Sequence, residues 1–396
     1  MKIGNKYIVN IIDNDSNGNG IARIDNFVIF VSYALKDEEL EIEITSVNKR
    51  FANAKITKII KKSKYRCNIN CNSYDKCGGC AFLHTKKNIE NELKLQGINK
   101  LFNINIDKIL SNNEYNYRNK ATFHIKNNLI GYYSEKTNDI VEFDNCLLLD
   151  DRINKIYNYF KTSNLNNLDE IIVRVTTKEI MIIIKGNIKE YDINDLTSKY
   201  EINSIYLNDK LIYGNAYIIE ELNDIKYTIY PNAFFQVNYD NMKLLYDKVL
   251  EYADIGNKLL DLYCGTGTIG IYLSKNFNKV IGIEINKEAI LNANINKKLN
   301  NINNIEFKCG DASTFKIDDY DVIVVDPPRS GLNKKTIDLL KQTNSKKIIY
   351  ISCNYKTLKR DIDLLNNYKL SKLEIINMFN KTKHCEVVAI LERKNK

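Results

Sequence analysis

Residues 258–270 read KLLDLYCGTGTIG, an apolar run that passes directly into a glycine loop. This pattern predicts a strand, a tight loop and then a helix. Gly265 and Gly267 permit backbone conformations that bring the chain close to a ligand. The glycine spacing differs from the G-x-G-x-x-G fingerprint of dinucleotide-binding proteins. The stretch therefore predicts a ligand site of another kind.

Strands and helices alternate on both sides of this loop. Five short apolar runs are predicted to be strands, at residues 258–262, 280–285, 305–308, 322–325 and 347–352. Most of them precede a loop and a helix, which is typical of a doubly wound parallel sheet. Ligands of such open sheets bind at the carboxyl ends of the strands. We expect an α/β domain at residues 231–396 with its site at that edge.

Three of these strands end at acidic residues. Glu284 stands where a carboxylate can accept hydrogen bonds from both hydroxyls of a ribose. Asp311 stands where it could meet an adenine amino group. Asp326 is followed by Pro327 and Pro328, which stiffen its loop because each fixes φ. With the glycine loop, these acids resemble those of the Rossmann-like class I methyltransferases, so S-adenosylmethionine is the expected cofactor.

A cysteine and a glutamate are the candidate reacting groups. Cys353 follows the fifth strand, beside the expected cofactor cleft, where a thiol is positioned as a nucleophile. Glu386 lies just before the last apolar run and can reach the same cleft. A thiolate that adds to carbon 6 of uracil makes carbon 5 able to take a methyl group, and a base then removes the carbon 5 proton. We expect Cys353 and Glu386 to perform these steps, with Asp326 at the polar edge of the ring.

Five motifs resemble the RNA uracil-5 methyltransferases, in their ribosomal-RNA branch with an iron–sulfur cluster. They are residues 234–238 (FFQVN), 261–267 (DLYCGTG), 326–329 (DPPR), 352–354 (SCN) and 384–386 (HCE). The resemblance covers nearly the whole chain. It implies that the cofactor is bound by Gln236, Tyr263, Glu284 and Asp326, and that Cys353 is the nucleophile and Glu386 the base.

Two positions depart from the family pattern. Tyr355 follows the Cys-Asn pair, and Asn380 follows Met-Phe, where proline is common in the family. These departures put the rigidity of two loops in question, but they remove no reacting group.

The nine cysteines include a candidate ligand set of four: Cys71, Cys77, Cys80 and the distant Cys146. Four thiolates suit either a 4Fe-4S cluster or tetrahedral zinc, and the spacing does not choose between them. The resemblance implies the iron–sulfur cluster, with His84 nearby. Cys67 is a competing ligand for the place of Cys71 or Cys146. The other cysteines, Cys264, Cys309 and Cys385, are expected to be small core residues.

The amino-terminal part reads as short strands separated by turns. Strands are expected at residues 6–13, 21–31 and 39–47, with a strong turn signal at residues 17–20 (NGNG). Closure into a small β-barrel is expected because it removes the sheet edges. This barrel, at residues 1–59, resembles an OB-like TRAM domain, which binds RNA.

The middle of the chain, residues 60–230, is expected to be a strand-rich α+β domain. It contains the cysteine cluster, a helical pattern at residues 86–104, and strands at residues 170–176 and 180–185. The sequence therefore predicts three parts in order: a small barrel, a central domain and an α/β domain.

The amino-acid composition of the chain indicates the chemical class of its binding partners. The chain has 58 Lys and Arg against 49 Asp and Glu, a net charge of +9, which fits a polyanion without requiring one. Aromatic and basic residues suited to bases and phosphates mix at Phe27, Phe30, Tyr33, Lys49, Arg50 and Phe51, and again at residues 115–120. No apolar run approaches the ~20 residues that span a bilayer, and no secretory signal is evident. We expect a cytoplasmic protein with reduced thiols.

Together these features predict methylation of carbon 5 of a flipped-out uridine in 23S ribosomal RNA by a monomer without an obligate protein partner. A transfer-RNA uridine is the nearest alternative, disfavoured because such relatives generally lack the cysteine cluster. A cytosine-5 methyltransferase usually has a cysteine near the fourth-strand proline, which is missing here. A non-catalytic RNA-binding iron–sulfur or zinc module would not need Cys353, Asp326 and Glu386 together.

Overall fold

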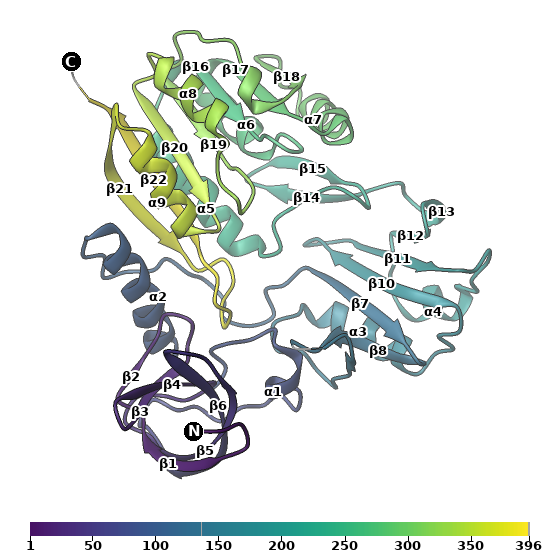
Figure 1. Cartoon of the computed structure of the whole chain (residues 1–396). Helices are drawn as coiled ribbons and strands as arrows, with labels where there is room; N and C mark the ends of the chain where they lie inside the picture. The colour runs from purple at the N-terminus through teal and green to yellow at the C-terminus, as the bar shows by residue number, and fades with distance from the viewer. Residues whose placement is uncertain (136, 395–396) are drawn as a thin grey trace. The chain divides into compact units, whose positions relative to one another are not determined.

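The computed structural model describes residues 1–135 and 137–394, which form two compact units (Figure 1). The first unit consists of Met1–Ile109 and the distant segment Phe379–Cys385. The second consists of the described residues of Leu110–Met378 together with residues 386–394. Within the described residues, no helix has both the length and the apolar character needed to cross a membrane.

The first unit begins with a curled six-stranded sheet. Its strands are β1 (Lys6–Asn10), β2 (Asp13–Asn14), β3 (Gly20–Ile24), β4 (Phe27–Val31), β5 (Glu39–Val47) and β6 (Phe51–Lys61), in the order β1-β5-β6-β4-β3-β2. Alternate residues of β5, such as Leu40, Ile42 and Ile44, are fully buried in one apolar core. The expected small barrel is confirmed. Because successive side chains of a strand point to opposite faces, alternate residues of each strand turn toward this core.

Two strand expectations for this sheet are wrong. Residues 6–13 are divided between β1, which ends at Asn10, and β2, which begins at Asp13. Residues 21–31 form two paired strands, β3 and β4, and not a single strand. Asp25 and Asn26, at the turn between them, both have positive φ (48° and 64°). Two such residues make the hairpin turn whose twist matches that of its strands, and Asp and Asn tolerate this conformation best among residues with a side chain.

Two helices complete the first unit. The short helix α1 (Tyr74–Cys77) lies within the cysteine loop, and α2 (Lys87–Phe102) follows it. The helix expected at residues 86–104 is therefore confirmed. Leu93 of α2 packs with Ala81 and Phe82 in a small apolar cluster.

The second unit begins with a seven-stranded sheet. Its strands are β7 (Lys120–Lys126), β8 (Leu129–Tyr133), β9 (Ile140–Val141), β10 (Leu168–Val175), β11 (Ile180–Gly186), β12 (Ser204–Leu207) and β13 (Lys210–Gly214), in the order β13-β12-β11-β10-β7-β8-β9. Helices α3 (Asp151–Lys161) and α4 (Asn194–Lys199) contribute buried residues to the same core as alternate strand residues such as Ile171, Val173 and Ile182. The strand-rich central part is confirmed.

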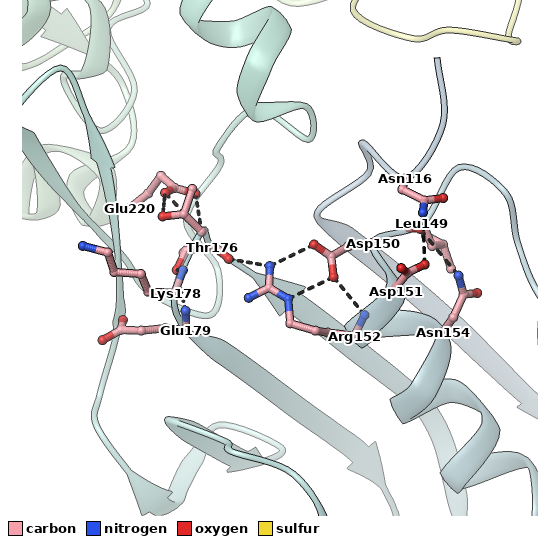
Figure 2. Close-up of polar contacts among 11 residues, drawn as sticks. Asn116, Leu149, Asp150, Asp151, Arg152, Asn154, Thr176, Lys178, Glu179 and Glu220 are labelled. Atoms are coloured by element: carbon pink, nitrogen blue, oxygen red, sulfur yellow. Dashed lines mark hydrogen bonds and ion pairs between the residues drawn. The ribbon is translucent and has the colours of Figure 1, made fainter. Parts of the chain in front are cut away.

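A chain of polar contacts ties this sheet to the next element (Figure 2). Arg152 of α3 donates to both carboxyl oxygens of Asp150 and, over 2.7 Å, to the carbonyl oxygen of Thr176. Thr177 then donates its hydroxyl to Oε1 of Glu220. Glu220 lies in β14 (Ile218–Leu222), which forms a hairpin with β15 (Ile225–Ile229).

The rest of the second unit is an α/β domain. Its sheet strands are β16 (Gly256–Leu262), β17 (Phe277–Glu284), β18 (Ile305–Cys309), β19 (Val322–Val325), β20 (Lys347–Ser352), β21 (Tyr368–Ile376) and β22 (Glu386–Arg393), in the order β18-β17-β16-β19-β20-β22-β21. The first five pair in parallel and β22 is antiparallel to β20. All five predicted strands are confirmed, so the carboxyl ends of β16–β20 share one edge.

One helix precedes the first of these strands, and further helices connect the strands. They are α5 (Tyr239–Ala253), α6 (Thr268–Leu273), α7 (Lys287–Leu299), α8 (Lys334–Gln342) and α9 (Tyr355–Leu364), with short 3-10 turns η1 (Ser274–Asn276) and η2 (Ala312–Thr314). The predicted sequence of barrel, strand-rich centre and α/β domain is thus observed. The boundaries at residues 59 and 230 stay predictions.

Candidate active site

The glycine loop joins β16 to α6 and is built from left-handed residues. Tyr263, Gly265 and Gly267 have φ values of 63°, 52° and 79°. A Cβ on Gly267 would stand 2.5 Å from the ring of Phe307, so this position has no room for a side chain. No atom lies within 4 Å of a Cβ built on Gly265. The loop therefore leaves open space in front of Gly265, as a cradle for a bound cofactor requires.

Glu284, the last residue of β17, lies beside this loop. Its Oε2 accepts a hydrogen bond from the backbone N–H of Gly265 (3.2 Å), and its Oε1 accepts one from Asn286 (2.9 Å). The backbone N–H of Gly310 donates to the carbonyl oxygen of Glu284. The structure thus brings the glycine loop, Glu284 and the turn after β18 to one place, as the sequence predicted.

Asp311 lies on that turn and caps η2. Its Oδ1 accepts a hydrogen bond from the backbone N–H of Ser313 over 2.7 Å. This contact with Ser313 holds the pKa of Asp311 below its usual range. Asp311 is therefore an ionised acceptor at the edge of the site, and it also serves as a helix cap.

Asp261 is a site residue that the sequence reasoning did not single out, although it is an acid inside an apolar strand. It is fully buried, and its Oδ2 accepts a hydrogen bond from the N–H of Gly270 (2.9 Å). Burial, together with the charges of Asp326 and Glu284, raises its pKa to about 8. Among the described residues its Oδ1 has no hydrogen-bond partner. Asp261 anchors the start of α6 behind the loop.

Cys353 and Glu386 come together at the end of the sheet. Ser352 and Val387 are partners across the antiparallel pair β20–β22, so the next residues outward, Cys353 and Glu386, are neighbours at the carboxyl end of β20. Burial and the Glu386 charge raise the pKa of the half-buried Cys353 thiol, whereas Arg329 lowers it. Glu386 is 5% exposed. The thiol and carboxyl predicted to react are thus adjacent.

Asp326 and Arg329 complete this group. Burial raises the pKa of Asp326 to about 7. Burial, and then the charge of Asp326, raises the pKa of Glu386 well above its ordinary value, while the Arg329 guanidinium lowers it. The Cys353 thiol and the Glu386 carboxyl, both with raised pKa values, are therefore close enough to the Arg329 guanidinium to be influenced by its charge. Raised pKa values of this kind suit groups that exchange protons.

Hydrogen bonds fasten the Asp326 loop to helix α9, which starts just after Cys353. The carbonyl oxygen of Arg329 accepts from Nδ2 of Asn354 and from Oγ1 of Thr357, both over 3.2 Å. Farther along, the N–H of Leu332 donates to the buried Asp361. Asn354 and Asp361 were not predicted to support this loop, since their contacts join residues distant in sequence.

Gln236 lies in the FFQVN segment, which precedes α5. Gln236 is largely buried, and its backbone carbonyl oxygen accepts a hydrogen bond from Nδ2 of Asn119 (3.1 Å). Asn238 caps α5 and donates from Nδ2 to the carbonyl oxygen of Met378 (3.0 Å). Phe235 is buried whereas Phe234 is 71% exposed. The segment is therefore held between the central sheet and the end of β21.

A hollow of about 740 Å³ lies next to the glycine loop. Gly265 and Glu284 line it, together with Tyr206 and Lys185 of the central sheet and Leu291 of α7. Among its lining residues there is none of the Cys353 group. The hollow therefore adjoins Gly265 and Glu284, two of the residues predicted to bind the cofactor.

The predicted metal ligands divide between the two units. Cys71, Cys77 and Cys80, like Cys67, are half-buried residues of the first unit, whereas Cys146 belongs to the second. The backbone N–H and carbonyl groups of Cys146 bond to the side chain of Asn154, whose contact with Leu149 appears in Figure 2. Among the described residues, no group of three or more His, Cys, Asp or Glu side chains is arranged to hold a metal ion.

His84 gives the cysteine loop one feature suited to a bound group. Its Nδ1 lies 2.7 Å from the hydroxyl of the buried Tyr74, and its carbonyl oxygen accepts from the N–H of Cys67. Burial and the charges of Arg66 and Lys381 lower its pKa to about 3, so the ring is neutral. Its buried Nε2 has no hydrogen-bond partner in the described part of the chain. A group held on this loop would satisfy that atom.

The expectation for the remaining cysteines is only partly confirmed. Cys264 and Cys385 are buried, as expected of small core residues. Cys309 is exposed, so its assignment to the core is wrong. It ends β18 at the open edge of the sheet, and its Sγ lies 3.5 Å from the carbonyl oxygen of Ile285.

Comparisons with known proteins agree with this geometry. The family model described as tRNA (Uracil-5-)-methyltransferase matches residues 84–394, and the TRAM domain model matches residues 2–57. Uncharacterized RNA methyltransferases of Clostridium tetani and Caldanaerobacter subterraneus are 33% and 34% identical to the chain. Each alignment covers 99% of the chain, and 97% and 99% of those proteins.

A solved structure is similar over nearly the full length. It is the Pyrococcus abyssi tRNA (uracil-54, C5)-methyltransferase in complex with S-adenosyl-L-homocysteine, with a TM-score of 0.81 and 28% identity. The similarity covers 97% of this chain and 99% of that chain.

Proposed function

Because the chain belongs to the family of the tRNA (uracil-5-)-methyltransferases, we propose that it methylates a specific uridine of 23S ribosomal RNA through a covalent Cys353 adduct. It is an RNA uracil-5 methyltransferase that uses S-adenosylmethionine and has an amino-terminal TRAM domain. The proposal adds the target RNA, the residues and their roles to that activity.

Cys353 is the proposed nucleophile. The thiol first loses its proton to solvent water. Its sulfur then bonds to carbon 6 of the uracil, and the electron pair of the double bond between carbons 5 and 6 moves toward carbon 5 and the carbonyl oxygen on carbon 4. The neighbouring Arg329 favours the thiolate, because its positive charge lowers the pKa of the Cys353 thiol. When bound, S-adenosylmethionine supplies the electrophilic methyl group that carbon 5 takes.

Glu386 is the proposed base for the second half of the reaction. Its carboxylate takes the proton from carbon 5, the double bond between carbons 5 and 6 returns, and the bond from carbon 6 to sulfur breaks. A carboxylate with a raised pKa accepts a proton more readily than an ordinary one. Asp326 is proposed to bind the polar edge of the uracil and the reacting end of the cofactor.

Six residues are proposed to hold the cofactor: Gln236, Tyr263, Gly265, Glu284, Asp311 and Asp326. The open space before Gly265 and the acceptor oxygens of Glu284 and Asp311 suit a nucleoside with two ribose hydroxyls and an amino group. These contacts orient the methyl donor toward the strand ends where Cys353 lies.

The observation that carries the proposal is the adjacency of Cys353 and Glu386 across the ends of β20 and β22. A test measures transfer of labelled methyl from S-adenosylmethionine to ribosomal RNA by the wild type and by Cys353→Ala. We expect incorporation by the wild type and none by the variant. Equal incorporation by both proteins would exclude Cys353 as nucleophile.

A uridine in transfer RNA is the second candidate target. It is supported by the similarity to the Pyrococcus abyssi transfer-RNA enzyme. The ribosomal target is supported by the cysteine-rich loop, through its resemblance to the cluster-bearing branch. Mass mapping of 5-methyluridine in both RNAs, from cells with and without the protein, separates them: the RNA that loses the mark is the substrate.

We also propose that Cys71, Cys77, Cys80 and Cys146 hold a 4Fe-4S cluster, with zinc as the alternative. Thiolates suit both, and the unpartnered Nε2 of His84 on the same loop supports a bound group. Because methyl transfer needs no electron, the group would stabilise the fold or contact RNA. Iron, sulfide and zinc analysis of anaerobically purified protein distinguishes the two, and a Cys77→Ser variant should lose the bound metal.

A further inference from the structure

A buried cluster of charges lies in the first unit. Glu90, Lys94 and Lys381 are 0%, 3% and 1% exposed. Nζ of Lys94 lies 2.8 Å from Oε1 of Glu90, and Nζ of Lys381 lies 3.4 Å from Oε2. Burial of such charges carries a large desolvation cost, so a gain in stability is a weak explanation for them.

The backbone around Lys381 is held as closely as its side chain. Its N–H donates to Oε1 of Glu90 (2.9 Å), and its carbonyl oxygen accepts from the N–H groups of Ala81 (2.8 Å) and Phe82 (3.1 Å). Nζ of Lys94 also reaches the carbonyl oxygen of Phe379. Lys381 has a φ of 63°, a left-handed conformation that residues with a Cβ rarely adopt. Several independent contacts therefore fix this one residue.

The position of Lys381 in the chain gives the cluster a consequence. Phe379–Cys385 joins β21 to β22, two strands of the α/β domain, yet the segment packs with the first unit. Glu386, the proposed base, directly follows Cys385. The contacts that hold Phe379–Cys385 therefore restrict the position of the Glu386 backbone.

We propose that Lys381 is a positioning residue for Glu386, and that the cluster of Glu90, Lys94 and Lys381 anchors the segment that delivers this carboxyl. The inference rests on the proposed role of Glu386. It assigns to helix α2 and the end of the cysteine loop a part in the reaction, since Glu90 and Lys94 lie in α2 and Ala81 follows Cys80.

The reaction chemistry predicts which step becomes slower when the contacts of Lys381 with Glu90 are weakened. Bond formation from sulfur to carbon 6 and methyl transfer to carbon 5 do not use Glu386. Removal of the carbon 5 proton does, and until it occurs the bond from carbon 6 to sulfur cannot break. A displaced base should therefore leave methylated RNA covalently attached to Cys353.

Lys381→Met tests the proposal because it keeps the length of the side chain and removes its charge. With labelled S-adenosylmethionine and substrate RNA, we expect about one methyl transferred per enzyme at the wild-type rate. Steady-state kcat should then fall tenfold or more with KM for RNA unchanged. A labelled RNA–protein complex that survives denaturing gel electrophoresis should accumulate. Lys199→Met, which removes an exposed ion pair with Asp195 (2.8 Å), is the matched control and should behave as wild type.

Several results would overturn the proposal. Wild-type kcat without a trapped complex would show that Lys381 does not position the base. Loss of the first turnover along with later ones would assign the cluster to folding or to the nucleophile. If the Lys381→Met variant does not fold, Glu90→Gln tests the proposal in the same assay. This substitution removes the negative charge of Glu90 and keeps the side-chain oxygen that accepts the hydrogen bond from the Lys381 N–H. A wild type that methylates no RNA would instead refute the proposed function.

Discussion

Asn354 donates a hydrogen bond from Nδ2 to the carbonyl oxygen of Arg329 over 3.2 Å, and it directly follows Cys353. The same side chain accepts from the N–H of Lys356 and thereby caps α9. One residue thus joins the strand end that bears the thiol to the loop that bears Asp326. This arrangement links Cys353 and Asp326 more directly than their separation in sequence suggests.

The Asn354→Ala variant should lose both contacts. Removal of an N-cap costs about 1 kcal/mol of stability, so the free energy of unfolding should fall by roughly that amount. We expect the turnover number to fall about tenfold, because a misplaced reacting group weakens catalysis strongly. Urea unfolding and steady-state methylation measure the two effects. Asn333→Ala, which removes the cap of α8, is the control and should lose stability alone. Unchanged turnover in Asn354→Ala would contradict the proposed support of the loop.

The Glu386→Gln variant should stop the reaction after methyl transfer. The amide is similar in size but cannot accept the carbon 5 proton, so methylated RNA should remain attached to Cys353. We expect a denaturation-resistant complex and loss of steady-state turnover. The double variant Cys353→Ala/Glu386→Gln should form no complex, which identifies the attachment point. Normal turnover of Glu386→Gln would exclude this carboxyl as the base.

Asp261 should make stability depend on pH. Its pKa is raised to about 8 in the folded protein, against ~3.9 for an unfolded aspartate. The folded state therefore binds more protons between these values, and the free energy of unfolding should decrease as pH rises from about 4 to about 8. Urea unfolding of cofactor-free protein across this range should show a flatter profile for Asp261→Asn. Parallel profiles for the two proteins would show that Asp261 titrates normally.

Gly267→Ala should damage the glycine loop more than its backbone conformation alone explains. Gly267 and Gly4 have similar φ values (79° and 85°), but only a Cβ at Gly267 would meet Phe307, at 2.5 Å, while Gly4 has nothing within 4 Å. Alanine in a left-handed conformation costs about 1 kcal/mol. We expect that loss in Gly4→Ala, and about 2 kcal/mol more, with weakened S-adenosylmethionine binding, in Gly267→Ala. Calorimetry measures both, and equal losses would contradict the predicted clash.

Much of the α/β domain could be predicted because its signals are local. A largely apolar segment, residues 258–264, followed by Gly265 and Gly267 indicates strand and loop without reference to any distant residue. Parallel order then places Glu284, Asp311 and Asp326 at one edge. Local signals also led to wrong predictions. Residues 21–31 were predicted as one strand because they are largely apolar, although Asp25 and Asn26 form a hairpin turn. Cys309 was assigned to the core because cysteine is usually buried.

The chain's local patterns were thus sufficient for the order of its parts, the cofactor loop and the identity of the candidate thiol and carboxyl. The pairing of β20 with β22, the fastening of the Arg329 loop by Asn354 and the burial of Lys381 against Glu90 required the folded molecule. Each joins residues far apart in sequence. Their contacts depend on which side chains are enclosed together and deprived of water, and no local periodicity encodes that.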